Sequence, residues 1–468
     1  MTLLEEFVFA LSRTKREKLR PLQFRGTKRK IFYKILDCRD RKGIDSASLM
    51  KMYKLTPKRY YLMHAEILQS CYKDIAPHGG IDLLLFLGNK QLYRHLHKEM
   101  QRQEEYLKSK NNPKALEQYY FRMLLMQNLF FVPQNLEGGI LAEFDAYDER
   151  YIAVKKPHPH DSLYLKSIEF HRKISDLLNK EFDFEQFRRA TEELDGILQE
   201  LKKGDHALAK YLPNNSLMHI YAANYFPAKS ALPYARYARE LLKEHPDVFA
   251  PLEEYIMLTT DKFFPHDPAE RIERIKKYLA SSEKKAGVSL KILGNFFPAI
   301  LDAGELKWAK SYIANYFPFT IDLLRKDIAL FYWPLLALYH FHAAEFVEAE
   351  LCLQKAFRLN RETDFDIYLR CLDTTITALR SDPVQTDDKV NLHIRYAYRH
   401  GYEHGQGHKI IFLKSVRDLM KCVGTDRKKA SEMKAQFLRE LSGAERLTNL
   451  FMKIYNKYFP VEKRAILP

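Results

Sequence analysis

The chain has 468 residues, of which 76 are Lys or Arg and 60 are Asp or Glu, so its formal net charge is +16. This length allows two or three domains or one long repeat array, and the low glycine count of 17 favours helices, so we predict an all-α fold. No apolar run approaches the ~20 residues that a membrane-spanning helix needs, and we expect a cytoplasmic protein without a membrane span.

The N-terminal region, residues 1–131, is predicted to be helical and basic. Thr2 and Glu5 have the spacing of a capping box, in which two side chains satisfy backbone N–H groups at the start of a helix. Apolar side chains follow at helical spacing. Further helices are expected in these segments: residues 31–36, 47–53, 58–72 and 83–129.

A strongly basic stretch, residues 12–30, follows the first predicted helix. It contains nine Lys or Arg residues and one acidic residue, Glu17. Such side chains bind the phosphate groups of nucleic acid or anionic lipid. We predict phosphate binding at these residues: Arg25, Lys28, Arg29 and Lys30. The alternative is a solvated surface that pairs with acidic residues elsewhere in the chain, because basic runs alone are non-specific.

Composition predicts three further regions. Residues 132–161 concentrate Pro, Gly, Asn and Asp and are predicted to form a linker. Residues 162–380 show successive amphipathic helices and are predicted to form helical repeats. Residues 381–468 are predicted to form a basic helical C-terminal region, since residues 391–468 hold 16 Lys or Arg against 7 Asp or Glu.

A tetrapeptide with two aromatic residues before a proline recurs along the chain. It occurs at residues 224–227, 262–265, 295–298, 315–318 and 457–460. Because proline disfavours helical geometry at the residue before it, we expect a helix to end at each of these sites. The aromatic residues would then anchor that end between neighbouring helices. The alternative is a repeated aromatic recognition surface.

Residues 333–360 show the architecture of the predicted repeats most plainly. Two helices are predicted on either side of residues 343–345, marked by Trp333, Leu336, Ala337 and His340 and then by Ala349, Leu353 and Ala356. This pattern resembles a tetratricopeptide (TPR) repeat. The layout of the whole chain also resembles uncharacterised helical-repeat proteins of Bacteroidota.

The TPR resemblance implies a solenoid of stacked helix pairs that binds a protein partner through a groove. In that family the groove is lined by the first helix of each pair, which here gives Phe331, Leu338, Phe341 and His342. This set is apolar and lacks the Lys and Asn pair of a carboxylate clamp. We therefore expect the groove to hold an apolar helix or to be covered by the next helix of the chain.

Three histidines form the best metal candidate. His400, His404 and His408 have a spacing that would place three imidazoles on one helical face, as a zinc or iron site needs. Gly401, Gly405 and Gly407 argue against a continuous helix, so we predict a polar turn between two helices and no metal site.

Motifs for catalysis are absent from the sequence. It contains no nucleotide-binding loop, metalloprotease motif or nucleophile elbow. Its five cysteines include no C-x-x-C pair. We expect a non-enzymatic protein without a cofactor, with buried thiols in a reducing compartment.

Two functions from different classes remain. The first is a scaffold or adaptor that binds a protein partner through helical-repeat surfaces. The second is a nucleic-acid-associated regulator that uses the basic N- and C-terminal regions. Salt separates the two, because binding through phosphate contacts weakens steeply as salt rises.

Overall fold

The computed structural model describes residues 2–38, 46–76, 80–90, 92–127, 140–155, 161–167, 169, 184–222, 228–249, 252–264, 267–285, 288, 290–359, 364–400, 407–441 and 445–460. Across these ranges the regular secondary structure is helical, with an isolated β-bridge between Ser12 and Pro318. The all-α prediction is confirmed. No helix in these ranges is both long enough and apolar enough to cross a membrane.

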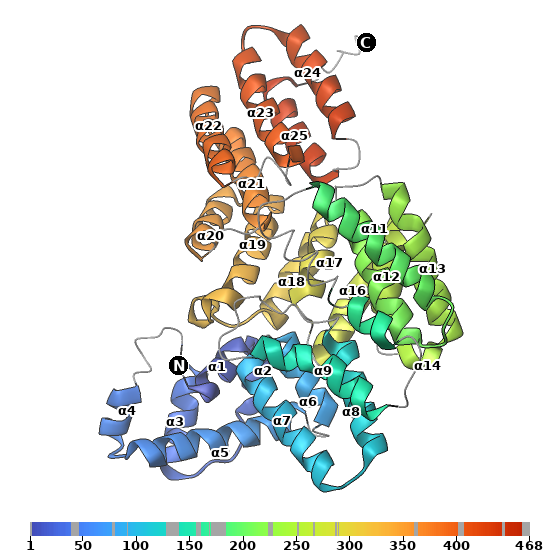
Figure 1. Cartoon of the computed structure of the whole chain (residues 1–468). Coiled ribbons are helices and arrows are strands. Elements are labelled where there is room, and N and C mark those ends of the chain that lie inside the picture. Colours follow the sequence, from blue (N-terminus) through green and yellow to red (C-terminus); the bar gives the residue numbers. More distant parts are fainter. Residues whose placement is uncertain are drawn as a thin grey trace. The chain divides into compact units, whose positions relative to one another are not determined.

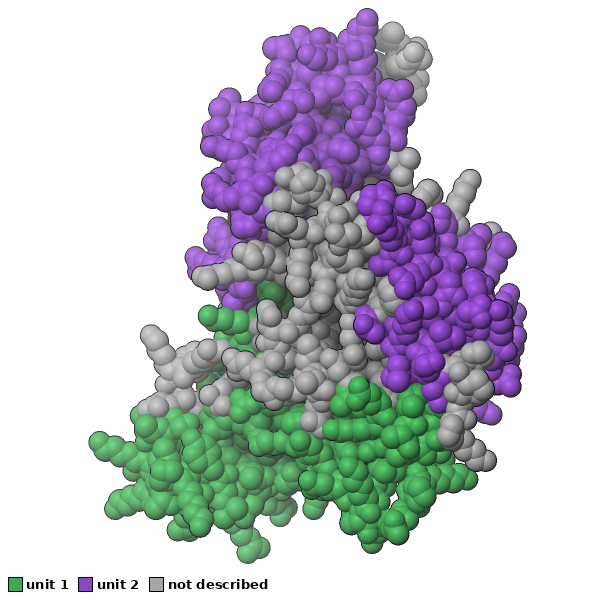
Figure 2. Space-filling model, viewed as in Figure 1, with its two compact units in different colours: residues 1–158, 266–343 green, residues 159–265, 344–468 purple. Residues whose placement is uncertain are grey.

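The chain divides into two compact units (Figure 2). Unit 1 comprises Met1–His158 and His266–Ala343, and unit 2 comprises Pro159–Pro265 and Ala344–Pro468. Each unit therefore joins two segments that are distant in the sequence, whereas the composition predicts regions that follow one another along the chain.

The first segment of unit 1 is a series of helices (Figure 1). Their bounds are α1 Leu3–Ala10, α2 Arg13–Leu19, α3 Gly26–Leu36, α4 Ser46–Met52, α5 Pro57–Ile75, α6 Gly80–Asn89, α7 Tyr93–Ser109, α8 Pro113–Gln127 and α9 Ile140–Val154. The helices predicted at residues 31–36, 47–53 and 58–72 are confirmed.

Helix α1 begins with the predicted capping box, which is confirmed. The backbone N–H of Glu5 donates to Thr2 Oγ1 at 3.3 Å, and the backbone N–H of Thr2 donates to Glu5 Oε2 at 2.8 Å. Phe7 of α1 is fully buried and packs edge-on against Tyr72 of α5, with ring centroids 5.2 Å apart. Helix α1 is thus a central element on which α3 and α5 pack.

Helix α9 lies within the segment that the composition predicts as a linker. Its Tyr147 is fully buried and packs against Tyr119 and Tyr120 of α8. Each ring buries a large apolar area. This burial stabilises a helix in a segment whose composition predicts a linker. The rest of that segment, residues 132–139 and 156–160, lies outside the described residues.

The second segment of unit 1 contains α16 Pro268–Lys285, α17 Leu290–Asp302, α18 Leu306–Tyr316, η4 Ile321–Leu323 and α19 Lys326–His342. A buried ion pair joins it to the first segment. Lys90 Nζ lies 2.9 Å from Oε1 and 3.2 Å from Oε2 of Glu283, and the two side chains are only 3% and 4% exposed. Lys15 Nζ lies 3.8 Å from the same carboxylate.

Unit 2 is also helical. Its first segment contains α11 Phe184–Leu201, α12 Ala207–Ala222, η2 Ala228–Ala231, α13 Leu232–Glu244, α14 Pro246–Phe249, α15 Glu253–Thr260 and η3 Asp261–Phe263. Its second segment contains α20 Phe346–Leu359, α21 Asp364–Arg380, α22 Pro383–Arg399, α23 Gly407–Cys422, α24 Arg427–Glu440 and α25 Glu445–Tyr458. From α20 to α24, each helix packs on the next.

The helix bounds predicted within residues 333–360 are confirmed. Helix α19 ends at His342, Ala344 has a positive φ of 59°, and α20 begins at Phe346. The small residues that mark the two helices, Ala337 and Ala349, are fully buried. Helix α19 belongs to unit 1 and α20 to unit 2.

The five cysteines are all buried, and each is a free thiol. Burial raises the pKa of Cys71 and of Cys371 to about 12. A thiol with such a pKa stays protonated at neutral pH and is a poor nucleophile. The prediction of buried thiols is confirmed.

Candidate nucleic-acid interface

Two basic residues of α2 point into unit 1 rather than into solvent. Arg16 is 3% exposed, and its Nη1 donates to the carbonyl oxygens of Leu36 at 3.2 Å and Cys38 at 3.3 Å. Its guanidinium also lies 5.1 Å from the ring centre of Phe319. Lys15 faces Glu283. Arg16 and Lys15 therefore stabilise the folded unit and are not available to bind phosphate groups.

The predicted phosphate-binding residues lie at the start of α3. Arg25, Arg29 and Lys30 are exposed, and in the described part of the chain none of the three forms an ion pair. Lys28 is half-buried and forms an ion pair with Glu66 of α5. The structure therefore presents three of these cations to solvent and uses the fourth to hold α3 beside α5.

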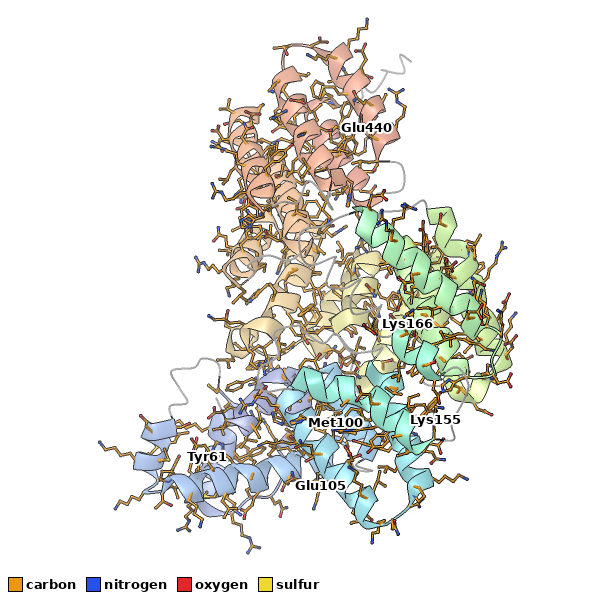
Figure 3. All side chains as sticks on the ribbon, viewed as in Figure 1. Tyr61, Met100, Glu105, Lys155, Lys166 and Glu440 are labelled. Carbon is orange, nitrogen blue, oxygen red and sulfur yellow. The ribbon has the colours of Figure 1, made fainter. Side chains whose placement is uncertain are left out.

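A second group of exposed cations lies on α4, on α5 and between them. These residues, which no motif or long basic run marks in the sequence, are Lys51, Lys54, Lys58 and Arg59. Between residues 46 and 65 the sequence has four basic residues and no acidic residue. Large apolar side chains accompany them: Met52, Tyr61 and Leu62 are 58%, 55% and 57% exposed. Figure 3 labels Tyr61.

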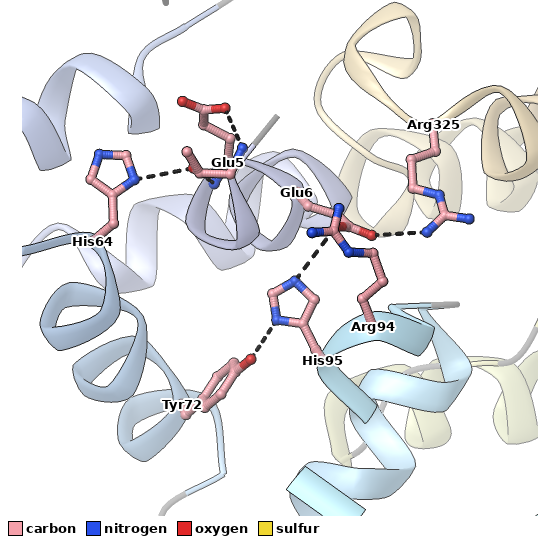
Figure 4. Close-up of polar contacts among 8 residues, drawn as sticks. Glu5, Glu6, His64, Tyr72, Arg94, His95 and Arg325 are labelled. Carbon is pink, nitrogen blue, oxygen red and sulfur yellow. Dashed lines mark hydrogen bonds and ion pairs between the residues drawn. The ribbon is translucent and has the colours of Figure 1, made fainter. Parts of the chain in front are cut away.

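The opposite face of α5 is fixed to the core of unit 1. Its buried side chains recur every three or four residues: Tyr60, Met63, His64, Ile67, Leu68, Cys71 and Tyr72. Midway along the helix, His64 Nδ1 and the Thr2 hydroxyl are hydrogen-bonded at 3.1 Å (Figure 4). Burial lowers the pKa of His64 to about 4, so the ring is neutral at pH 7. These contacts determine which face of α5 meets solvent.

A buried polar cluster fixes the C-terminal end of α5 (Figure 4). The Tyr72 hydroxyl is hydrogen-bonded to His95 Nδ1 on α7, and His95 Nε2 lies 3.9 Å from Glu6 Oε2 on α1. Arg325 Nη1 lies 3.4 Å from Glu6 Oε1. Burial lowers the pKa of His95 to about 3, so this histidine is neutral at pH 7, and Arg325 supplies positive charge for Glu6. The cluster ties α1, α5 and α7 together.

The residues predicted to bind a protein partner do not share an open face. Leu338 and Phe341 are 4% and 2% exposed, so both are core residues. Phe331 and His342 are partly exposed, and His342 Nε2 lies 3.4 Å from Asp302 Oδ1. The spacing correctly predicts an apolar face on α19. It does not predict which residues of that face the rest of the fold covers.

The three histidines of the metal candidate do not lie on one continuous helix. His400 follows the end of α22, and His408 is the second residue of α23. His404 lies outside the described residues. Among the described side chains, no cluster of three or more His, Cys, Asp or Glu residues has the arrangement of a metal site.

Comparison of the chain with protein-family models, curated proteins and solved structures gave no match.

Proposed function

We propose that this protein binds nucleic acid through exposed cations on α3, α4, α5 and the connection between α4 and α5. These residues, the basic surface, are Arg25, Arg29, Lys30, Lys51, Lys54, Lys58 and Arg59. The observation that carries the proposal is that, within the described residues, none of the seven is paired with a carboxylate. The solvated-surface alternative requires acidic partners of the kind that Lys28 finds in Glu66.

Phosphate binding would give these exposed cations a partner. Like charges on one surface repel each other, and a polyanion relieves that repulsion while releasing its condensed counterions. An exposed aromatic side chain such as Tyr61 adds a surface for stacking or for contact with a base. The basic surface therefore matches a nucleic acid in charge and in side-chain type.

Neutralising part of the basic surface tests the proposal. In the variant Arg25→Gln/Arg29→Gln/Lys30→Gln, we expect affinity for a nucleic acid to fall roughly tenfold at about 0.1 M salt. The slope of log K against log salt should also become shallower by up to about 3, because each phosphate contact contributes about 0.9. Fluorescence anisotropy with a labelled duplex and a labelled single strand measures both quantities.

The matched control removes the same charge from another surface of unit 1. Lys277, Lys307 and Lys310 are exposed residues of α16 and α18, and Lys277→Gln/Lys307→Gln/Lys310→Gln should leave the salt slope unchanged. Equal losses in both triple variants would show that net charge alone drives binding. Absence of binding by the natural chain at low salt would contradict the proposal outright.

A second proposal is a TPR-like solenoid that acts as a cytoplasmic, non-enzymatic scaffold. Packing of each helix on the next from α20 to α24 supports it, because solenoids are built from neighbouring helices, although α25 also packs back on α21 and α23. The exposed pair Val347 and Leu351, 50% and 54% exposed on one face of α20, is the observation that favours a protein partner.

Capture from native lysate after nuclease treatment tests the scaffold proposal. A partner that binds α20 should be lost from Val347→Glu/Leu351→Glu, because burying a carboxylate in an apolar contact is costly. It should be retained by Val384→Glu/Leu392→Glu, which alters two apolar residues of α22 that are at least as exposed. A partner that vanishes with nuclease would instead favour the basic surface.

A further inference from the structure

The connection between α4 and α5, residues 53–56, has a defined hydrogen-bonded geometry. Lys54 has a positive φ of 51°. The N–H of Leu55 donates to the carbonyl oxygen of Met50 at 2.8 Å, and the N–H of Lys54 donates to that of Lys51 at 3.3 Å. This pair of bonds is the Schellman motif that ends a helix at a left-handed residue. These hydrogen bonds therefore end α4 at this turn.

The next helix starts at once. The Thr56 hydroxyl accepts a hydrogen bond from the N–H of Arg59 at 3.3 Å, and Pro57 occupies the first position of α5. Both features favour helix initiation. A short helix, a tight turn with a left-handed residue and a second, longer helix thus follow one another within residues 46–75.

A buried side chain on each helix and one hydrogen bond accompany this turn. Leu49 of α4 and Tyr60 of α5 are 1% and 0% exposed. The Tyr60 hydroxyl lies 3.4 Å from Ser46 Oγ and so links the two helices directly. Helices α1 and α3 pack on α5. A short helix, a tight turn and a longer helix that further helices support follow one another here, which is the order of elements in a helix-turn-helix.

We infer that α4 and α5 form a helix-turn-helix unit whose second helix binds in the major groove of duplex DNA. The inference rests on the proposed function and names the form of nucleic acid. In such units the early residues of the second helix contact base edges. Here the exposed early residues of α5 are Pro57, Lys58, Arg59, Tyr61, Leu62 and Ala65, and the exposed Glu66 that follows them pairs with Lys28.

The exposed side chains at the start of α5 can contact base edges, and the neighbouring cations can contact phosphates. An arginine donates to the acceptors of guanine in the major groove, and apolar side chains such as Leu62 and Ala65 contact the methyl group of thymine. Lys51, Lys54 and the exposed cations of α3 would meet the flanking phosphates. Residues 58–65 span about 10 Å of helix, so α5 reads about three base pairs and relies on phosphate contacts for much of its affinity.

Selection from a library of randomised duplexes with the full chain tests the inference. We expect enrichment of a short motif and salt-sensitive binding to all duplexes. The variant Arg59→Ala/Leu62→Ala should reduce the preference for the selected duplex over a scrambled one by about tenfold, whereas its affinity for the scrambled duplex should fall only by the smaller amount expected from the loss of one cation of the basic surface. Gln69→Ala/Lys73→Ala, which alters exposed residues farther along the same helix, should leave that preference unchanged.

The possible failures are distinguishable. Salt-sensitive binding without any enriched motif, or equal binding of single strands, overturns the helix-turn-helix inference and leaves the proposed function standing. Binding only to vesicles of phosphatidylserine and phosphatidylcholine, with no affinity for nucleic acid, overturns both. Because Arg59 and Leu62 are exposed, circular dichroism should show unchanged helix content in their variant. A change in helix content together with loss of all binding would mean that these side chains support the fold, which also overturns the inference.

Discussion

Replacing Glu283 by Met is expected to lower the free energy of unfolding of unit 1 by about 3–5 kcal/mol. The substitution keeps the side-chain volume but removes the carboxylate that neutralises Lys90 at 2.9 Å and Lys15 at 3.8 Å. Both cations lie inside the unit, where water cannot replace the lost partner. Urea denaturation at pH 7 measures the difference.

Lys15 adds a pH dependence to this result. Burial, and then the charge of Lys90, lower the pKa of Lys15 from 10.5 to about 8, although Glu283 raises it. Between pH 8 and 10.5 the unfolded chain binds this proton and the folded chain does not, so the Lys15 contribution to stability rises with pH. Since Lys15 is neutral above pH 8, the deficit of Glu283→Met should be smaller at pH 9 than at pH 7.

Two further variants decide whether charge is the cause. Lys90→Met/Glu283→Met should recover part of the loss, because removing both partners of a buried pair leaves one fewer uncompensated charge. Glu105→Met, at an exposed position of α7 labelled in Figure 3, should change stability by less than about 0.5 kcal/mol. A double variant as unstable as Glu283→Met would assign the effect to packing instead.

Replacing Asp373 by Asn is expected to destabilise unit 2 by about 3 kcal/mol. Asp373 Oδ2 lies 2.9 Å from His393 Nε2 and 2.9 Å from Lys389 Nζ, and Asp373 is 5% exposed. Burial alone would raise the pKa of Asp373, but the hydrogen bond from His393 and the charge of Lys389 outweigh it, so the pKa lies below 3.8. The charged carboxylate therefore contributes stability at neutral pH, and that contribution is lost as the pH falls through the lowered pKa.

Denaturation curves of Asp373→Asn and of Asp388→Asn provide the measurement and its control. Asp388 is exposed on the same helix as His393, and its substitution should cost less than about 0.5 kcal/mol. If the two variants lost the same stability, the buried carboxylate would contribute nothing beyond a surface charge.

Local rules predicted helix starts well and helix ends less well. The capping box of Thr2 and Glu5 depends only on residues within one turn, and the structure has it. The proline rule succeeds where α18 ends at Tyr316, two residues before Pro318. It fails at Pro298, which lies inside α17. There Phe297 and Ile300 are fully buried, so tertiary packing outweighs the local cost of the proline.

The number of basic residues can be read from the sequence, but the sequence does not show which of them are buried and which are exposed. Arg16 and Arg25 look alike in a charge run, yet Arg16 is buried because its partners lie at Leu36, Cys38 and Phe319. Contacts at such separations leave no local pattern. The turn at Lys54 was missed for a related reason, because a left-handed position is normally signalled by glycine and here is occupied by lysine.

The pairing of Lys90 with Glu283 also has a consequence for synthesis of the chain. The two residues are 193 positions apart, and at about 5–20 residues per second translation separates their appearance by roughly 10–40 s. During that interval the nascent chain holds Lys90 without its carboxylate, and α16 to α19 are not yet available to cover the N-terminal helices. Unit 1 therefore completes its fold only after the first segment of unit 2 has been made.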